Sequence, residues 1–221
     1  MALLGQRRYD RFVGSSFTRS LGWFTAIVGA IGLLLYLFVF DTWEIPGGDP
    51  LFVASIQPTL IPQDRILTSR RSTPKFGELA RCLAPDGRGT YVIGRVFGVA
   101  GETVEVLNER VAVNGKSPSS RFACGTVNVM HPVSQQQLTL TCSAEDNGAF
   151  TYSVLTHPEY REGHTVAQVE PGKVFLVSDD RHIHLDSRDF GQVEASTCEH
   201  VVFRLWGERF TDSSRRFNIL W

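Results

Sequence analysis

The sequence of 221 residues predicts a mainly β domain preceded by one transmembrane helix. Three observations support this prediction. Residues 20–40 contain no charged side chain. The rest of the chain holds short segments rich in Val, Phe and Thr, and frequent Gly and Pro punctuate them, which is typical of strands joined by turns. The segment after the charge-free run, about 180 residues, is long enough for one well-packed domain with a small inserted lobe.

The charge-free run predicts a membrane helix over residues 20–41, after a basic tail at residues 1–19. As a helix the run spans about 30 Å, which matches the hydrocarbon core of a bilayer. The alternative is a cleaved secretory signal, whose apolar region is shorter, roughly 7 to 15 residues, and is followed by a small-x-small cleavage site. Here the run is longer and DTWEIPGGD follows it, so we expect a retained helix.

The charges that flank this run predict its orientation. Arginine residues precede it and acidic residues follow it, namely Arg7, Arg8, Arg11 and Arg19 before the run and Asp41, Glu44 and Asp49 after it. Positively charged segments stay in the cytoplasm. We therefore expect a single-pass protein of the inner (plasma) membrane, with a cytoplasmic N-terminus and the large domain on the outer side. The formal net charge of −1 gives no indication of a nucleic-acid partner.

The β domain is expected to comprise residues 42–116 and 171–221, with residues 117–170 as the inserted lobe. The lobe is predicted because that segment lacks long apolar runs. Apolar and polar residues alternate on both sides of Asn108 and Glu109, which predicts a hairpin with its turn there.

The four cysteines divide into two pairs in this interpretation. Cys124 and Cys142 bracket the lobe segment, and a disulfide between them is plausible in an oxidising outer compartment, although spacing alone does not establish it. Cys82 and Cys198 are expected to be buried apolar residues. No CxxC or Cys/His cluster predicts a metal site.

The first segment with chemical character is SIQPTL, residues 55–60. Proline fixes its own φ and biases the preceding residue to an extended conformation, so the hydroxyl of Ser55 stands at the start of a constrained turn. Taken alone, this segment is equally typical of a surface turn.

Five blocks together make the chain resemble the type I signal peptidases. SIQPTL followed by DRIL resembles the family's S-M-x-P-T-L-x-x-G-D-x-x-L-V, and PKFGE resembles P-x-R-G-D. YVIGRVFGVAGETVEV resembles Y-I-K-R-V-V-G-L-P-G-D-x-V-E-V, and RVAVNGK fits the hairpin after it. SDDRHIHLDSR, residues 178–188, resembles G-D-N-R-x-N-S-x-D-S-R. The blocks stand in the family's order over about 140 residues.

This resemblance implies a fold of antiparallel sheets with an inserted smaller lobe. It implies cleavage of exported precursor proteins after a small-x-small motif near the membrane. The implied partners are the signal-peptide region of those precursors and the lipid bilayer, with no cofactor and no metal. In the family a serine attacks the scissile carbonyl, a neutral lysine accepts its proton, and backbone and hydroxyl donors hold the oxyanion.

Carried onto this chain, the resemblance makes Ser55 the nucleophile and its backbone N–H an oxyanion donor. The lysine position falls on Gly94, which has no titratable group. The neighbouring Arg95 cannot act as the base because a guanidinium stays protonated. The family's oxyanion hydroxyl falls on Val53 and is therefore lost. Ile93 and Val53 are expected to shape the substrate pocket because they flank the two catalytic positions.

One substitution offers another base. The family serine that contacts the lysine falls on His184, and an imidazole can accept a proton near neutral pH. Asp186 or Asp179 could then orient the ring as a third member. Alternatively, His184 is a polar residue on a relaxed loop, and Asp186 and Arg188 form a structural ion pair. Arg95, Asp179 and Arg188 are expected to be structural residues near the site. His182 is expected to be exposed.

Two functions of different class follow. One is a membrane-bound serine endopeptidase with Ser55 as nucleophile and His184 as base. The other is a pseudopeptidase that binds signal-peptide-like segments or regulates processing without cleavage. A third, narrower version of the enzyme would process a single pilus or conjugation substrate.

Overall fold

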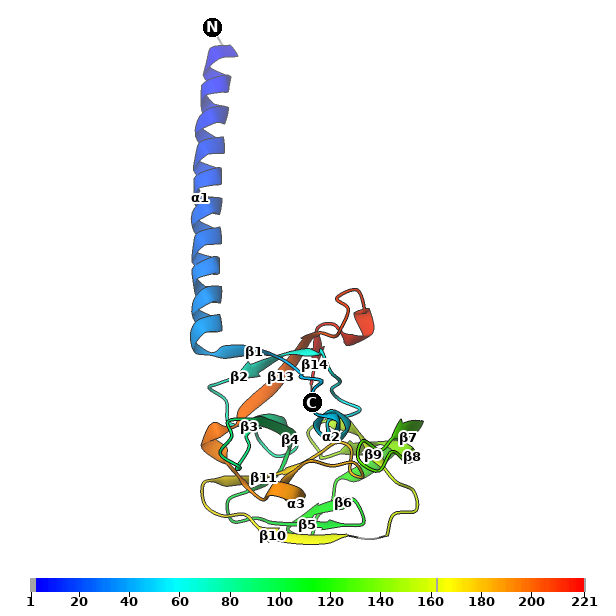
Figure 1. Cartoon of the computed structure of the whole chain (residues 1–221). Helices are drawn as coiled ribbons and strands as arrows, with labels where there is room; N and C mark the ends of the chain where they lie inside the picture. Colours follow the sequence, from blue (N-terminus) through cyan, green and yellow to red (C-terminus); the bar gives the residue numbers. More distant parts are fainter. Residues whose placement is uncertain (1–2, 162, 221) are drawn as a thin grey trace. The chain divides into compact units, whose positions relative to one another are not determined.

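The computed structural model describes residues 3–161 and 163–220 and divides into two units, residues 1–40 and 41–221 (Figure 1). Helix α1 extends over Leu3–Phe38, so the basic segment predicted as a tail is helical as well. Its segment Thr18–Phe38 has 21 residues, a mean hydropathy of 2.1 and no buried side chains. By length and composition, this is the single helix in the described residues that could cross a membrane.

The larger unit is built mainly of antiparallel strands, as predicted. Its main sheet has the strand order β1-β2-β13-β3-β4-β11-β12, and β14 pairs with β13. The strands are β1 (Phe40–Glu44), β2 (Arg65–Ser69), β3 (Leu79–Leu83), β4 (Tyr91–Val99), β11 (Lys173–Val177), β12 (Val193–Glu194), β13 (Glu199–Trp206) and β14 (Asn218–Ile219).

Two three-stranded sheets complete the unit (Figure 1). One contains β10 (His164–Gln168), β5 (Thr103–Leu107) and β6 (Arg110–Val113), and the other contains β7 (Ser119–Met130), β8 (Gln137–Asp146) and β9 (Thr151–Thr156). The hairpin predicted at Asn108 and Glu109 is confirmed, since Leu107 pairs with Arg110. Within the range predicted as a lobe, β7, β8 and β9 form their own sheet, whereas β10 pairs with β5.

Short helical turns lie between strands of the main sheet, namely α2 (Pro50–Ser55), α3 (Ser187–Phe190), η1 (Ala195–Thr197) and η2 (Ser213–Arg215). Helix α2 starts where the sequence favours it. The side chain of Asp49 accepts hydrogen bonds from the N–H groups of Leu51 and Phe52, and Pro50 occupies the first helical position. Both features stabilise a helix N-terminus, because they satisfy or remove N–H groups without partners.

An apolar cluster packs helix α2 against the main sheet. Phe52 and Ile56 from α2 and the turn after it lie against Ile93 of β4 and Ile66 of β2. Side chains alternate between the two faces of a strand, so Ile93 and Arg95 share one face of β4, and Val92 and Val96 belong to a different cluster. The face of β4 next to α2 is therefore the one that carries the family's arginine.

The cysteine prediction was wrong for one pair. Cys82 and Cys198 form a disulfide with Cα atoms 4.1 Å apart, because β13 runs beside β3 and Glu199 pairs with Arg81. This proximity depends on strand register across 116 residues, which sequence spacing does not reveal. Cys124 and Cys142 form the second disulfide, on the neighbouring strands β7 and β8.

Candidate active site

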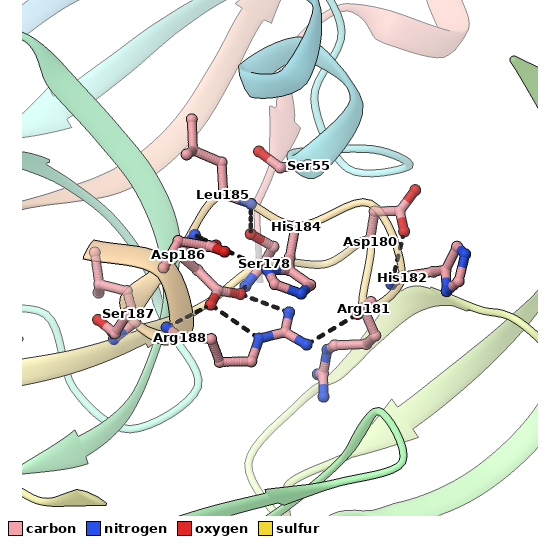
Figure 2. Close-up of polar contacts among 12 residues, drawn as sticks. Ser55, Ser178, Asp180, Arg181, His182, His184, Leu185, Asp186, Ser187 and Arg188 are labelled. Carbon is pink, nitrogen blue, oxygen red and sulfur yellow. Dashed lines mark hydrogen bonds and ion pairs between the residues drawn. The ribbon is translucent and has the colours of Figure 1, made fainter. Parts of the chain in front are cut away.

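Ser55 is the last residue of α2 and is fully buried. Its hydroxyl donates a hydrogen bond to the carbonyl of Phe52 at 2.8 Å, one helical turn earlier. Figure 2 shows Ser55 at the end of this helix, next to the loop that carries Ser178, Asp180 and His184. In this conformation the hydroxyl is satisfied by its own helix rather than by a base.

The loop at residues 178–182 is attached to Ser55 through the backbone. The N–H of Asp180 donates to the carbonyl of Ser55 at 3.1 Å. On its other side the loop forms a parallel bridge with β9, in which Leu155 donates to Asp179 at 2.9 Å and accepts from Arg181 at 2.8 Å. The loop thus lies between the candidate nucleophile and the third strand of the β7–β9 sheet.

A buried ion pair fixes the start of this loop. The guanidinium of Arg95 donates to both carboxylate oxygens of Asp179, at 2.7 and 3.1 Å, and to the carbonyl of Gly77 at 2.9 Å. Arg95 is fully buried, its guanidinium carbon lies 4.1 Å from the ring centre of Tyr152, and Thr59 donates to Asp179. This bidentate geometry places Arg95 and Asp179 as structural partners beside the site.

Gly94 lies between Ile93 and Arg95 on β4 and pairs with Ala80 of β3. A Cβ atom at this position would come 3.1 Å from the Cβ of Leu176 and 3.3 Å from the carbonyl oxygen of Val177. The chain's lysines are Lys75, Lys116 and Lys173. Among the described residues, no lysine is hydrogen-bonded to Ser55. The family's lysine position is therefore closely packed and holds no amine.

His184, the predicted substitute base, has a different partner in the structure. Its Nδ1 lies 2.7 Å from the carboxylate of Asp189, and no hydrogen bond joins it to Ser55 within the described chain (Figure 2). Asp189 was missed at the sequence level. The signal for it was the spacing Asp186-x-x-Asp189, typical of a reciprocal helix cap, which α3 indeed has. The role of His184 as a base stays a prediction.

Asp186 is held by Arg188 rather than by His184. Arg188 donates to both of its carboxylate oxygens, at 2.9 and 2.7 Å, and the N–H of Ser178 adds a bond of 2.7 Å. Burial alone would raise the pKa of Asp186, but the charge and hydrogen bonds of Arg188 bring it below its ordinary value. The ion pair that the alternative interpretation expected between Asp186 and Arg188 is present, and the role of Asp186 stays a prediction.

His184, Asp186 and Asp189 lie close enough to resemble a metal site, with candidate ligand atoms within 4.8 Å of one another. Three of their four carboxylate oxygens already have partners. Asp186 is bound on both oxygens by Arg188, and one oxygen of Asp189 accepts from the N–H of Asp186 and contacts His184. This arrangement is that of a helix cap beside an ion pair, and it gives no cation a free carboxylate pair.

The prediction that His182 is exposed was wrong. Its side chain is only 17 % exposed, and its Nδ1 lies 2.6 Å from the buried carboxylate of Glu109. The sequence interpretation placed this ring outward, but Glu109 in the turn of the β5–β6 hairpin contacts it. Nearby, burial raises the pKa of Asp180 to about 7, against the lowering effect of hydrogen bonds from Ile183 and His182.

An apolar groove of about 480 Å³ adjoins helix α2. Its lining includes Trp43, Phe52, Tyr91, Leu185 and Phe190. Ile93 and Val53, the two residues predicted to shape the substrate pocket, do not line this groove. Ile93 is buried in the core, and Val53 packs half-buried against the same cluster. Leu185 follows His184 directly, so the groove begins beside the loop that carries the candidate base.

The comparisons with known proteins identify one family. Residues 18–206 match the family described as signal peptidase, peptidase S26. The chain is 24% identical to signal peptidase I V of Bacillus subtilis (strain 168), with 81% of this chain and 95% of the relative aligned. It is 28% identical to signal peptidase I of Bacillus caldolyticus, with 83% and 88% aligned.

A crystal structure of a signal peptidase I from Enterococcus faecalis V583 is 23% identical, with a TM-score of 0.34, and the match covers 59% of this chain and 97% of that one. The family match extends over most of the chain and includes the segments that hold Ser55, Arg95 and Asp179. Together with the apolar helix Thr18–Phe38, it indicates a membrane-anchored protein. The chain therefore belongs to the type I signal peptidases, peptidase family S26.

Proposed function

We propose that this chain binds the signal-peptide segment of exported precursors in the apolar groove beside α2, and that Ser55 is its nucleophile. The groove is the observation that carries the proposal, because a cleft lined by large apolar side chains, beside the helix that ends in the buried Ser55, fits an apolar peptide. Trp43, Phe52 and Tyr91 are among its large apolar side chains.

Cleavage requires the hydroxyl of Ser55 to leave the carbonyl of Phe52 and attack the scissile carbonyl. The oxyanion that forms would be held by backbone N–H groups, because Val53 offers no hydroxyl. Loss of one such donor costs about 2.7 to 4 kcal/mol in the barrier. A slow enzyme is therefore expected even with a competent base.

His184 is the proposed base. It belongs to the same loop as Leu185 of the groove, and its ring would have to turn from Asp189 toward Ser55 once substrate is bound. Catalytic hydrogen bonds are often long or misaligned without substrate and tighten only in the complex. A neutral imidazole can take the serine proton and return it to the leaving amine.

The test is cleavage of a peptide containing Ala-x-Ala by the full chain in detergent. We expect Ser55→Ala and His184→Ala each to abolish cleavage. His164→Ala is the matched control, because His164 also pairs with a carboxylate, that of Glu105 at 2.8 Å, but on an exposed surface. Cleavage that survives Ser55→Ala would refute the assignment of the nucleophile.

A second candidate function is binding without cleavage. Two observations favour it, namely the glycine at position 94 and the bond from the Ser55 hydroxyl to Phe52. It predicts that the peptide binds, stays intact, and is bound equally well by Ser55→Ala.

Gly94→Lys separates the two functions further. A lysine there would return an amine to the position of the family's base, and Gly94→Ala controls for the crowding by Leu176 and Val177. If the chain lacks only a base, Gly94→Lys gains cleavage that Gly94→Ala does not. If both variants remain inactive while peptide binding persists, the missing amine is not the only defect.

The proposed orientation has the N-terminus in the cytoplasm and residues 42–221 on the outer side of the membrane. The arginines before the apolar helix and the acidic residues after it support this. Protease added to spheroplasts should degrade the large unit and leave the N-terminus protected. Protection of the large unit would reverse the topology.

A further inference from the structure

Glu109 occupies an unusual position for a glutamate. It is the second residue of the two-residue turn between β5 and β6, with φ of 68°, yet only 4% of it is exposed. Such turns favour Asn-Gly, because a side chain in the left-handed region is strained. The chain therefore keeps a carboxylate at a position where glycine would be favoured, and buries it.

The carboxylate of Glu109 joins two other segments. One oxygen lies 2.6 Å from Nδ1 of His182, and the other accepts from the N–H of His157 at 2.8 Å. The ring of His182 also packs on the ring of His157, with centroids 4.8 Å apart, and against the ring of Tyr160 at 5.2 Å. The turn thus clamps the loop after β9 to the loop at residues 178–182.

A chain of hydrogen bonds leads from this clamp to the candidate nucleophile. The N–H of His182 donates to the carboxylate of Asp180 at 3.0 Å, and the N–H of Ile183 donates to the same oxygen at 2.7 Å. The N–H of Asp180 donates to the carbonyl of Ser55 at 3.1 Å. Three hydrogen bonds therefore separate Glu109 from Ser55.

We propose that Glu109 is a positioning residue for the peptidase reaction, because through His182 and Asp180 it holds the loop that fixes the backbone of Ser55. This inference rests on the proposed role of Ser55 as nucleophile. Glu109 does not line the apolar groove, so it acts on the placement of the serine rather than on peptide binding.

The same hairpin offers a matched control. Glu105 pairs with His164 at 2.8 Å, but both side chains are about half exposed, and within the described residues neither is hydrogen-bonded to the loop at residues 178–182. Glu105→Gly removes a glutamate–histidine pair without touching the path to Ser55. Any effect of Glu109→Gly that Glu105→Gly does not have therefore results from the loss of the contacts of Glu109 with His157 and His182.

Glu109→Gly is the informative variant because glycine tolerates the turn's positive φ, so the fold should survive. The full chain in detergent is followed by amide hydrogen exchange of Asp180 and by peptide cleavage. We expect exchange at Asp180 to rise at least tenfold and kcat to fall at least tenfold. KM should change less than twofold, and the melting temperature should stay within a few degrees of wild type. Glu109→Gln, which keeps an acceptor for His157 and a partner for His182, should recover much of both losses.

Unchanged exchange at Asp180 in Glu109→Gly would overturn the proposal, and so would a loss of kcat without increased exchange. A loss of kcat matched by Glu105→Gly would overturn it as well. If the wild-type chain cleaves no peptide, the proposed function fails, but the exchange measurement still decides whether Glu109 positions the loop.

Discussion

Strands β4 and β7 are both long antiparallel strands, but their surroundings differ completely. The seven central residues of β4 are all buried, whereas β7 is exposed along nearly its whole length. Each belongs to a sheet with one disulfide and an arginine–aspartate pair. The Arg95–Asp179 pair is buried on both sides, and Arg121 of the Arg121–Asp146 pair is 61% exposed. Similar interactions should therefore contribute very different amounts to stability in the two sheets.

The two disulfides give the largest expected contrast. Cys82–Cys198 closes 116 residues and Cys124–Cys142 closes 18. On the chain-entropy model, removing the first by a double Cys→Ser change should cost about 5 kcal/mol and removing the second about 3 kcal/mol. Urea unfolding of both variants in detergent measures the difference. An equal loss of unfolding free energy in both variants would show that the segment between Cys82 and Cys198 retains structure in the unfolded chain.

The ion pairs give the next contrast. Arg95→Leu leaves the buried carboxylate of Asp179 without its main partner and should destabilise the fold by about 3 to 5 kcal/mol. Arg121→Leu breaks an exposed pair and should cost at most about 1 kcal/mol. Thermal melts compare the two. If Arg95→Leu lowers the stability no more than Arg121→Leu does, burial of an ion pair does not decide how much the pair contributes to stability.

The buried Asp180 should also make the stability of the fold depend on pH. An aspartate titrates near 3.9 when unfolded, and burial raises the pKa of Asp180 to about 7 in the fold. Its favourable contribution is fully present below about pH 4 and is lost as the pH rises through about 7. Asp180→Asn should therefore be more stable than wild type at pH 8, on the order of 4 kcal/mol, and equal to it near pH 4. A difference independent of pH would contradict the buried titration.

The smallest contrast comes from one substitution made in both strands. Val96→Thr places a hydroxyl in a fully buried position of β4 and should cost about 2 kcal/mol. Val127→Thr changes a residue of β7 that is 37% exposed and should stay within about 0.5 kcal/mol. Chemical denaturation resolves both. Comparable losses would mean that β7 is covered by something outside this chain.

Sequence reasoning succeeded where the information was local. The alternation around Asn108 and Glu109 predicted the hairpin, and the uncharged run predicted the apolar helix. It failed where strand register brings distant residues together, as for Cys82 and Cys198. It failed at His182 for the same reason, because a hairpin turn far away in the sequence buries that ring.

The candidate site likewise has features that the sequence could predict and features that it could not. Arg188 lies two residues from Asp186, so their pairing could be anticipated from the motif. The groove could not, because Trp43, Tyr91 and Phe190 come from three separate segments. The partner of His184 was within reach of sequence reasoning, since Asp189 stands at the spacing of a reciprocal cap.

The parallel bridge between Leu155 and Asp180 has a consequence for attempts to graft or trim this protein. Strand β7, which is exposed along nearly its whole length, could be shortened or exchanged with that of another peptidase. Strands β8 and β9 could not, because Glu145 of β8 binds the buried Arg181 of the loop and the backbone of β9 forms the bridge to that loop. A chimera should therefore take its junctions before Gln137 and retain everything after it.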